Sequence, residues 1–228
     1  IYFEFGYNGG LYSLFTTIGM SATAILMVFY PAISKKVPRK KLMSIMQVVS
    51  IVGYVTMLIP GLALGTSMTK FYLITIGYML ANFGQYCFYL IMMISIMNTV
   101  EYNEYKNGSR SEAIITSLRP FFTKMGGALV VVITAASYLL FGVTGLTNQI
   151  SEYENEAARN LITETQKLSA IEGVLSNVQR SQTTGLLICI TIVPLAFMLA
   201  AYFLYRRHYR LDEAEYDRIC TQLAARKG

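Results

Sequence analysis

The sequence predicts an all-α membrane protein, and three observations support this class. Hydrophobic residues make up 54% of the 228 residues, charged residues make up 14%, and the mean hydropathy is +0.45. The charged residues are gathered in short clusters, which a soluble core of this size would not require. Long apolar runs separate these clusters.

Five apolar runs are long enough to cross the ~30 Å hydrocarbon core of a bilayer as helices. Glycine and proline interrupt the runs, as membrane helices tolerate. The predicted spans cover residues 10–33, 42–63, 70–98, 112–145 and 183–205.

The opening residues 1–6 are interpreted as the end of a truncated span, because they carry no helix start signal and no signal-peptide pattern. With this end the set becomes six helices, the size of half a twelve-helix carrier. Such halves consist of two three-helix units of inverted topology.

The lysines and arginines predict how the spans are oriented. Ten of them lie on one side of the five spans, in segments 35–41, 106–110 and 206–210, and four lie on the other side. The positive-inside rule places the richer side, with the tail 206–228, in the cytoplasm. The net charge of +6 is explained in this way, and no nucleic-acid partner is predicted.

The third run carries a polar and aromatic stripe. Asn82, Gln85, Tyr86, Tyr89 and Met93 follow helical spacing, so they lie on one face of an otherwise apolar helix. Two functions stay open for this stripe. It forms hydrogen bonds between helices, or it binds a sugar through amide groups and a flat ring.

Arg119 and Lys124 lie inside the fourth run, whereas residues 10–33, 42–63, 71–98 and 183–205 contain no charged residue. An unpaired charge near the bilayer centre costs about 2.5–3.5 kcal/mol, so such a residue normally faces a wet cavity, a partner or a ligand. This pair predicts a transporter.

The segment 146–182 is polar, with apolar residues at roughly helical spacing. We expect short amphipathic helices over the outer face of the protein. They form either a solvated lid without ligand contacts or a substrate gate.

Residues for catalysis or metal binding are sparse. Cys87, Cys189 and Cys220 match no metal-ligand spacing, and the single histidine, His208, lies in the basic tail. The protein is therefore predicted not to be an enzyme, and no cofactor or metal is expected in this chain.

The segment after the third run, NTVEYNEYKNGSRSE (98–112), alternates acids and bases in a spacing that suits ion pairs. From Asn98 to Gly127 the chain resembles the glycoside-pentoside-hexuronide:cation symporter family of the major facilitator superfamily. That family has two aspartates three residues apart, then a Tyr-Gly-Glu-Tyr/Trp-Lys motif, an Arg, and a Lys fourteen residues later. The corresponding residues here are Asn98, Glu101, Tyr102, Glu104, Tyr105, Lys106, Arg110 and Lys124. Similar segments at YFEFGYNGGLYSLF, PAISKKVPRKKL and YRRHYRLDEAEYDRI extend the resemblance over nearly the whole chain except the outer loop.

The resemblance implies a C-terminal six-helix half of a major facilitator fold, with inverted three-helix repeats. It implies symport of a sugar with a monovalent cation by alternating access in the cell membrane. Lys124 would lie at the central cavity, and Tyr89 stands where relatives carry a stacking tryptophan. Glu101, Glu104, Arg110 and Asn98 would take part in the cytoplasmic gate.

Two residues depart from the family pattern. Asn98 replaces a carboxylate, which reduces any charged gating pair there to hydrogen bonding. Arg119 replaces an amide residue, and a guanidinium beside the cavity suits an anionic sugar such as a uronate. Alternatively, Arg119 extends to the membrane interface or pairs with Glu101.

The implied partners are a sugar or glycoside, the lipid bilayer, an N-terminal six-helix half and a coupling cation (Na⁺, Li⁺ or H⁺). The cation is expected at the N-terminal half, because no predicted span of this chain contains Asp or Glu apart from Glu112 at the start of the fourth. Other classes stay open: a carrier of an amphiphilic or other anionic substrate in the same fold, or a membrane scaffold that transports nothing.

Overall fold

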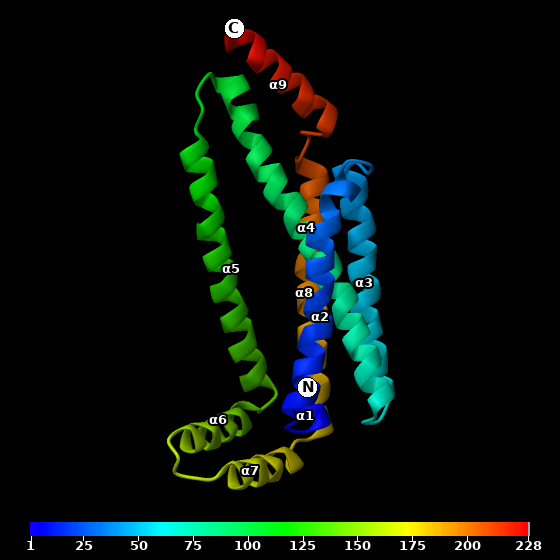
Figure 1. Ribbon diagram of the computed structural model, residues 1–228, viewed down its shortest axis with the longest axis vertical. Helices are drawn as coiled ribbons and strands as arrows, with labels where there is room; N and C mark the ends of the chain where they lie inside the picture. Colours follow the sequence, from blue (N-terminus) through cyan, green and yellow to red (C-terminus); the bar gives the residue numbers. More distant parts are fainter. Residues whose placement is uncertain (228) are drawn as a thin grey trace.

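The computed structural model describes residues 1–227, with side chains at all of these positions except 22, 23, 26, 27 and 227. Within this range the chain forms nine helices and no strand, so the all-α prediction is confirmed (Figure 1). The helices are α1 (Tyr2–Phe5), α2 (Gly9–Ser34), α3 (Arg39–Ala63), α4 (Met68–Asn107), α5 (Glu112–Leu140), α6 (Thr144–Ala158), α7 (Glu164–Ser176), α8 (Arg180–His208) and α9 (Glu213–Lys227).

Five long helices correspond to the five predicted runs. Among the described residues, α3, α4, α5 and α8 have the length and apolar composition of membrane-spanning helices. The 26-residue α2 contains no Asp, Glu, Lys or Arg. The predicted end of a truncated span forms the four-residue α1.

Two glycines decide where α4 and α5 end. Gly108 follows α4 with a φ of 70°, and its N–H donates to the carbonyl of Glu104, so the helix extends beyond residue 98 to Asn107. Gly142 has a φ of 65° just after α5, which ends at Leu140 rather than at residue 145. Glycine accepts this left-handed conformation without a steric penalty.

The core is built around α4, which packs against α2 and α3, while α8 packs against α3 (Figure 1). Small residues let α3 and α4 approach closely. A Cβ atom at Gly53 would lie 2.4 Å from the backbone nitrogen of Ala81, and one at Gly77 would lie 2.7 Å from the carbonyl of Gly53. In a bilayer the hydrophobic effect does not drive helices together, so their association depends on close van der Waals packing, which small residues permit.

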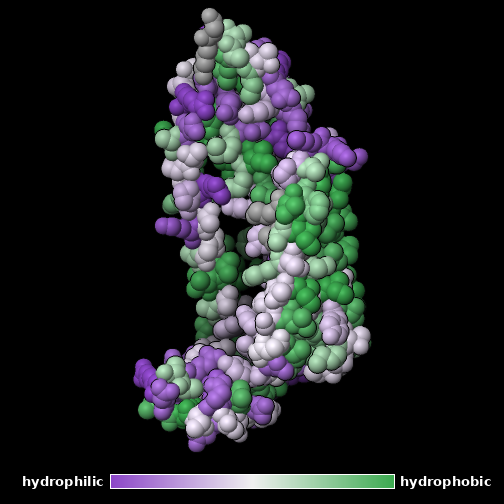
Figure 2. All heavy atoms as spheres, in the orientation of Figure 1, coloured by the Kyte–Doolittle hydropathy of each residue, from purple (hydrophilic) through white to green (hydrophobic). Residues whose placement is uncertain are grey.

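Helix α5 lies apart from this bundle. It contacts α4, α6 and α8 but runs separately along most of its length, and a hollow separates it from the other helices (Figures 1 and 2). Ser137 is the one buried residue among those described in α5. The apolar side chains of α5 are therefore left uncovered by this chain.

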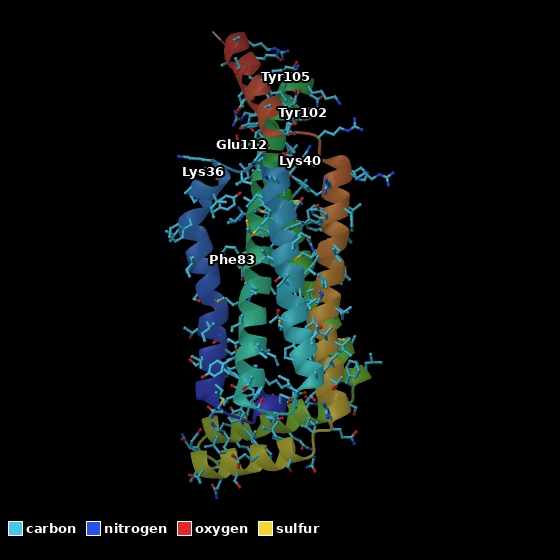
Figure 3. The ribbon with its side chains drawn as sticks, turned by 90° about the vertical axis from the view of Figure 1, so that its right-hand side faces the viewer. Lys36, Lys40, Phe83, Tyr102, Tyr105 and Glu112 are labelled. Carbon is cyan, nitrogen blue, oxygen red and sulfur yellow. The ribbon has the colours of Figure 1, made fainter. Side chains whose placement is uncertain are left out.

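The two ends of the bundle differ in composition. The connections that hold residues 35–38 and 108–111 lie at one end with α9, and we call this the basic end (Figure 1). Lys36, Lys40 and Glu112 can be followed there in Figure 3, with Tyr102 and Tyr105. Helices α1, α6 and α7 lie at the opposite end, where α7 starts with a capping box between Thr163 and Gln166.

Candidate functional site

The stripe on α4 runs along two cavities. Asn82 and Gln85 line a cavity of about 760 Å³ that α1, α3 and α8 also enclose. Tyr89 and Met93 line a second cavity of about 500 Å³ between α4 and α5. Tyr86 lines neither cavity and is 41% exposed.

An ion pair lies at the wall of the larger cavity. Lys70 is only 4% exposed, and its ammonium group is hydrogen-bonded to the carboxylate of Glu4. Thr66 donates a second hydrogen bond to the same carboxylate, at 3.2 Å. Sequence reasoning missed this pair because its members are 66 residues apart. No signal in the sequence pointed to it, because the burial of Lys70, which requires a partner, is seen only in the structure.

Across the smaller cavity, Arg119 on α5 reaches Tyr89 on α4. One guanidinium nitrogen, Nη2, donates to the Tyr89 hydroxyl at 3.4 Å. The walls around the two side chains are largely apolar, with Ile96, Ile115, Leu118 and Phe122 among them. The structure thus brings two predicted site residues from different helices to one cavity.

Lys124 is placed differently. Its side chain is exposed on α5, neither cavity includes it, and the described part of the chain holds no ion pair to it. The physical reason is the separation of α5 from the bundle, since no neighbouring helix of this chain encloses this stretch. Its place at a central cavity stays a prediction.

Arg110 is the centre of a charge cluster in the connection between α4 and α5. It lies 3.8 Å from Glu101, 3.5 Å from Glu104 and 2.9 Å from Glu112. The hydrogen bond and charge of Glu112, with the charges of Glu104 and Glu101, raise the pKa of Arg110 above its ordinary value. The ion pairs that the spacing predicted are present for Arg110, whereas no ion pair of Lys106 is found among the described residues, and Glu101 pairs with Arg110 rather than with Arg119. A role in gating stays a prediction.

Asn98, which the resemblance grouped with these residues, belongs to a different cluster. It is 8% exposed, and with its amide oxygen turned towards Arg39 it accepts hydrogen bonds from both terminal guanidinium nitrogens. In that orientation the amide nitrogen donates to the carbonyl of Ile94 at 3.1 Å. Arg39 also binds Glu213 at the start of α9.

A comparison with known families decides the identity of the chain. The model of the family described as MFS/sugar transport protein matches residues 4–213, most of the chain. The chain belongs to the MFS/sugar transport family. The resemblance to the sugar:cation symporters of the major facilitator superfamily is therefore confirmed, and so is the assignment to a major facilitator fold.

Curated relatives carry sugar-carrier names. A lactose permease of Leuconostoc lactis is 32% identical over 130 residues, which are 57% of this chain and 18% of that protein. A raffinose carrier protein of Pediococcus pentosaceus is 28% identical over 113 residues, 49% of this chain and 16% of that protein. The uncharacterized symporter YnaJ of Bacillus subtilis (strain 168) is 25% identical over 209 residues, 92% of this chain and 37% of that protein. The match thus spans well under half the length of each relative. No solved structure matches this chain.

As a member of the MFS/sugar transport family, the chain is part of a multi-pass membrane protein in a family of transporters rather than enzymes. The described residues contain no group of three or more His, Cys, Asp and Glu side chains placed to hold a metal ion.

Proposed function

We propose that the whole protein is a secondary active sugar transporter, and that the sugar binds where α4 faces α5. The observation that carries this proposal is the contact of Arg119 with Tyr89 across the smaller cavity. Membership of the family and the sugar-carrier names of two relatives support the choice of substrate.

The chemistry of this cavity suits a glycoside. The Tyr89 ring offers a flat apolar surface to the C–H face of a sugar ring, and its hydroxyl and the Arg119 guanidinium supply hydrogen-bonding groups. A volume of about 500 Å³ lies within the usual range of small-molecule sites. Arg119 also holds a carboxylate well, because its planar fork forms two parallel hydrogen bonds.

Two other residues of the stripe extend the pathway. Asn82 and Gln85 line the larger cavity further along the same face of α4, towards the opposite end. In the proposal they receive the sugar before it reaches Tyr89. Lys124 contacts the substrate or pairs with a carboxylate outside this chain.

The exposed α5 supports a larger assembly. Its apolar sides and Lys124 have no cover in this chain, and the relatives are much longer than the matched segments. In the proposal a second six-helix half covers α5 and provides the carboxylates for the coupling cation (Na⁺, Li⁺ or H⁺).

Alternating access requires a gate at each end. Arg110 with Glu101 and Glu104 closes the basic end, which faces the cytoplasm of a cell-membrane protein. Asn98 supports this gate through Arg39. Opening the gate breaks ion pairs that are partly exposed, so each step is easily reversed.

The test is uptake by the full-length protein in proteoliposomes. Labelled lactose, raffinose and a uronide are supplied while Na⁺, Li⁺ and pH gradients are imposed separately. Tyr89→Ala should abolish most uptake and Tyr89→Phe should retain most of it, because the ring is kept. Tyr86→Ala is the matched control, since Tyr86 is equally exposed on the same helix but lines no cavity. The absence of gradient-dependent accumulation of any glycoside or uronide would refute the proposal.

A further inference from the structure

Helix α3 starts without a cap of its own. The residue before it is Pro38, which makes no side-chain hydrogen bond to the first turn. The first backbone N–H groups of a helix require acceptors, and a buried start without them is costly. Here the acceptor comes from Glu213, 174 residues away, whose Oε1 accepts from the backbone N–H of Arg39 at 2.6 Å.

The same carboxylate neutralises the Arg39 side chain. Oε1 of Glu213 lies 3.0 Å from Nε of Arg39, whose side chain is only 9% exposed. Partial burial opposes ionisation of Glu213, yet the hydrogen bonds and the charge of Arg39 outweigh it, so the pKa of this carboxyl lies below its ordinary value.

Asn98 completes the cluster from α4. With its oxygen facing Arg39, the Asn98 amide is a neutral acceptor for the guanidinium. Asn98 shares the hydrogen bonds of Arg39 but cannot cancel its charge. Among the described residues that contact Arg39, the formal negative charge is provided by Glu213. A buried arginine left without a carboxylate is strongly destabilising.

The rest of α9 is held to the end of α4. Leu211, Ile219 and Leu223 form an apolar cluster with Tyr105, Tyr209 and Tyr216. Near the C-terminal end, Arg226 donates to the carbonyl of Tyr105 at 3.2 Å and lies 4.9 Å from the centre of its ring. Helix α9 is therefore fixed at both of its ends, beside the residues that bind Arg110.

We propose that Glu213 is a positioning residue of the inner gate: it caps α3, neutralises Arg39 and so ties α9 to the basic ends of α3 and α4. This inference rests on the proposed function for its transport readout. Helix α4 carries both Tyr89 and the gate acids, so loosening its basic end impairs the conformational cycle rather than sugar affinity.

The first experiment compares Glu213→Gln with Glu215→Gln in the full-length protein. Glu215 lies in the same helix and pairs with Arg218 within α9, so it is a matched control. Hydrogen exchange should become at least tenfold faster in Glu213→Gln, both in α9 and in the first turn of α3. The maximal rate of lactose uptake should fall severalfold with little change in KM. Glu215→Gln should change none of these.

The second experiment tests the charge on Arg39 directly. Adding Asn98→Asp to Glu213→Gln places a carboxylate beside the guanidinium from α4. Uptake should recover in this double variant while α9 still exchanges fast. Exchanging the charges, with Arg39→Glu and Glu213→Arg, should restore much of the protection of α9. Glu213→Asp keeps the carboxylate and serves as the folded reference.

The outcomes separate this inference from the proposed function. If Glu213→Gln leaves exchange and the uptake rate unchanged, the positioning role is refuted. If Asn98→Asp restores no uptake, charge neutralisation is refuted. A third outcome is that neither the unaltered protein nor any variant takes up a sugar, although Glu213→Gln still loosens α9. In that case the proposed function fails and the structural role of Glu213 stands.

Discussion

The roles of Tyr89 and Arg119 depend on the side chain that the fold places opposite each of them. Each lies on a largely apolar helix, and each is substantially exposed within this chain. Their hydrogen bond of 3.4 Å converts two isolated polar groups into one wall of a cavity. In the proposed function, a guanidinium in such a wall would select among sugars by their charge.

Arg119→Gln is expected to separate neutral from anionic substrates. Charge-assisted hydrogen bonds are about twice as strong as neutral ones. We therefore expect KM to rise by about tenfold more for a uronide than for lactose, given that 1.4 kcal/mol corresponds to a factor of ten. Concentration-dependent uptake of both sugars measures this difference. Equal increases would mean that Arg119 does not contact the charged group.

The sequence predicted Tyr89 and Arg119 as site residues but not their contact. Spacing along one helix places a side chain on a face, whereas the partner across the cavity depends on how α4 and α5 diverge. The pairs Lys70–Glu4 and Arg39–Glu213 were out of reach for the same reason. Their members are 66 and 174 residues apart, and each of these residues alone fits an ordinary topological or surface role.

At the scale of the helices, the contact of α3 with α4 depends on glycine. Gly77 of α4 faces the backbone of α3, where an added Cβ would lie 2.7 Å from the carbonyl of Gly53 and 2.8 Å from the backbone nitrogen of Met57. Backbone atoms cannot move aside as a flexible side chain can. The helices would have to separate along their whole contact.

Gly77→Ala should therefore destabilise the protein, although alanine favours a helix. Overpacking a tight contact typically costs about 1–3 kcal/mol. Gly173→Ala is the matched control, because Gly173 also lies inside a helix and has open space at the Cβ position. Thermal unfolding of the purified protein should show a lower midpoint for Gly77→Ala only. An unchanged midpoint would show that α3 and α4 can separate freely.

Tyr7 links helices α6 and α7 of the opposite end to the segment before α2. The Tyr7 hydroxyl donates to Glu154 of α6 at 2.7 Å, and Lys167 of α7 lies 5.8 Å from the centre of the Tyr7 ring. The hydrogen bond to Glu154 is the main cause that raises the pKa of Tyr7 above its ordinary value. This attachment connects the outer segment to the start of α2.

The attachment should be present at neutral pH and lost in strong alkali. A group whose pKa is raised in the attached state stabilises that state below its ordinary pKa, about 10 for tyrosine, and loses this contribution as the pH rises through the raised value. Spin labels at Ser13→Cys and Ser151→Cys would report the distance between α2 and α6. It should stay constant from neutral pH to about pH 10 and lengthen only in stronger alkali.

Tyr7→Phe should lengthen the same distance already at neutral pH, because a hydrogen bond to a charged group is worth about 1.5 kcal/mol or more. Tyr153→Phe removes a phenol from α6 itself and should leave the distance unchanged. A short distance in Tyr7→Phe would show that packing alone holds the outer helices.

The element boundaries show which parts of the fold were predictable. The apolar runs in the sequence located the five long helices, because a helix that crosses a bilayer requires a continuous apolar segment. The end of α4 was not located by hydropathy, because its last turns are polar and are stabilised by α9 and by the Arg110 cluster rather than by lipid. The polar stretch 146–182 was recognised as amphipathic, but only the structure places α6 and α7 beside Tyr7.

For the whole molecule, the uneven distribution of lysine and arginine over its two ends predicts a single orientation. Cysteines introduced at Ser109 and Ser151 lie at the basic and the opposite end, respectively. With Cys220 replaced by serine in both variants, an impermeant thiol reagent applied to intact cells should label Ser151→Cys and spare Ser109→Cys, and the reverse should hold in inside-out vesicles. Labelling of both positions from one side would contradict the proposed topology.

The length of α4 has a mechanical consequence. Its 40 residues contain no proline, and a helix of that size is roughly 60 Å long, about twice the hydrocarbon thickness. If α4 tilts as a rigid body, it pivots about its crossing with α3. A tilt of about 5° would move the distant tip by roughly 3 Å, on the basis of the helix rise. A sugar that tilted α4 by this angle from near its middle would displace the far end of the helix by a distance comparable to the length of a hydrogen bond.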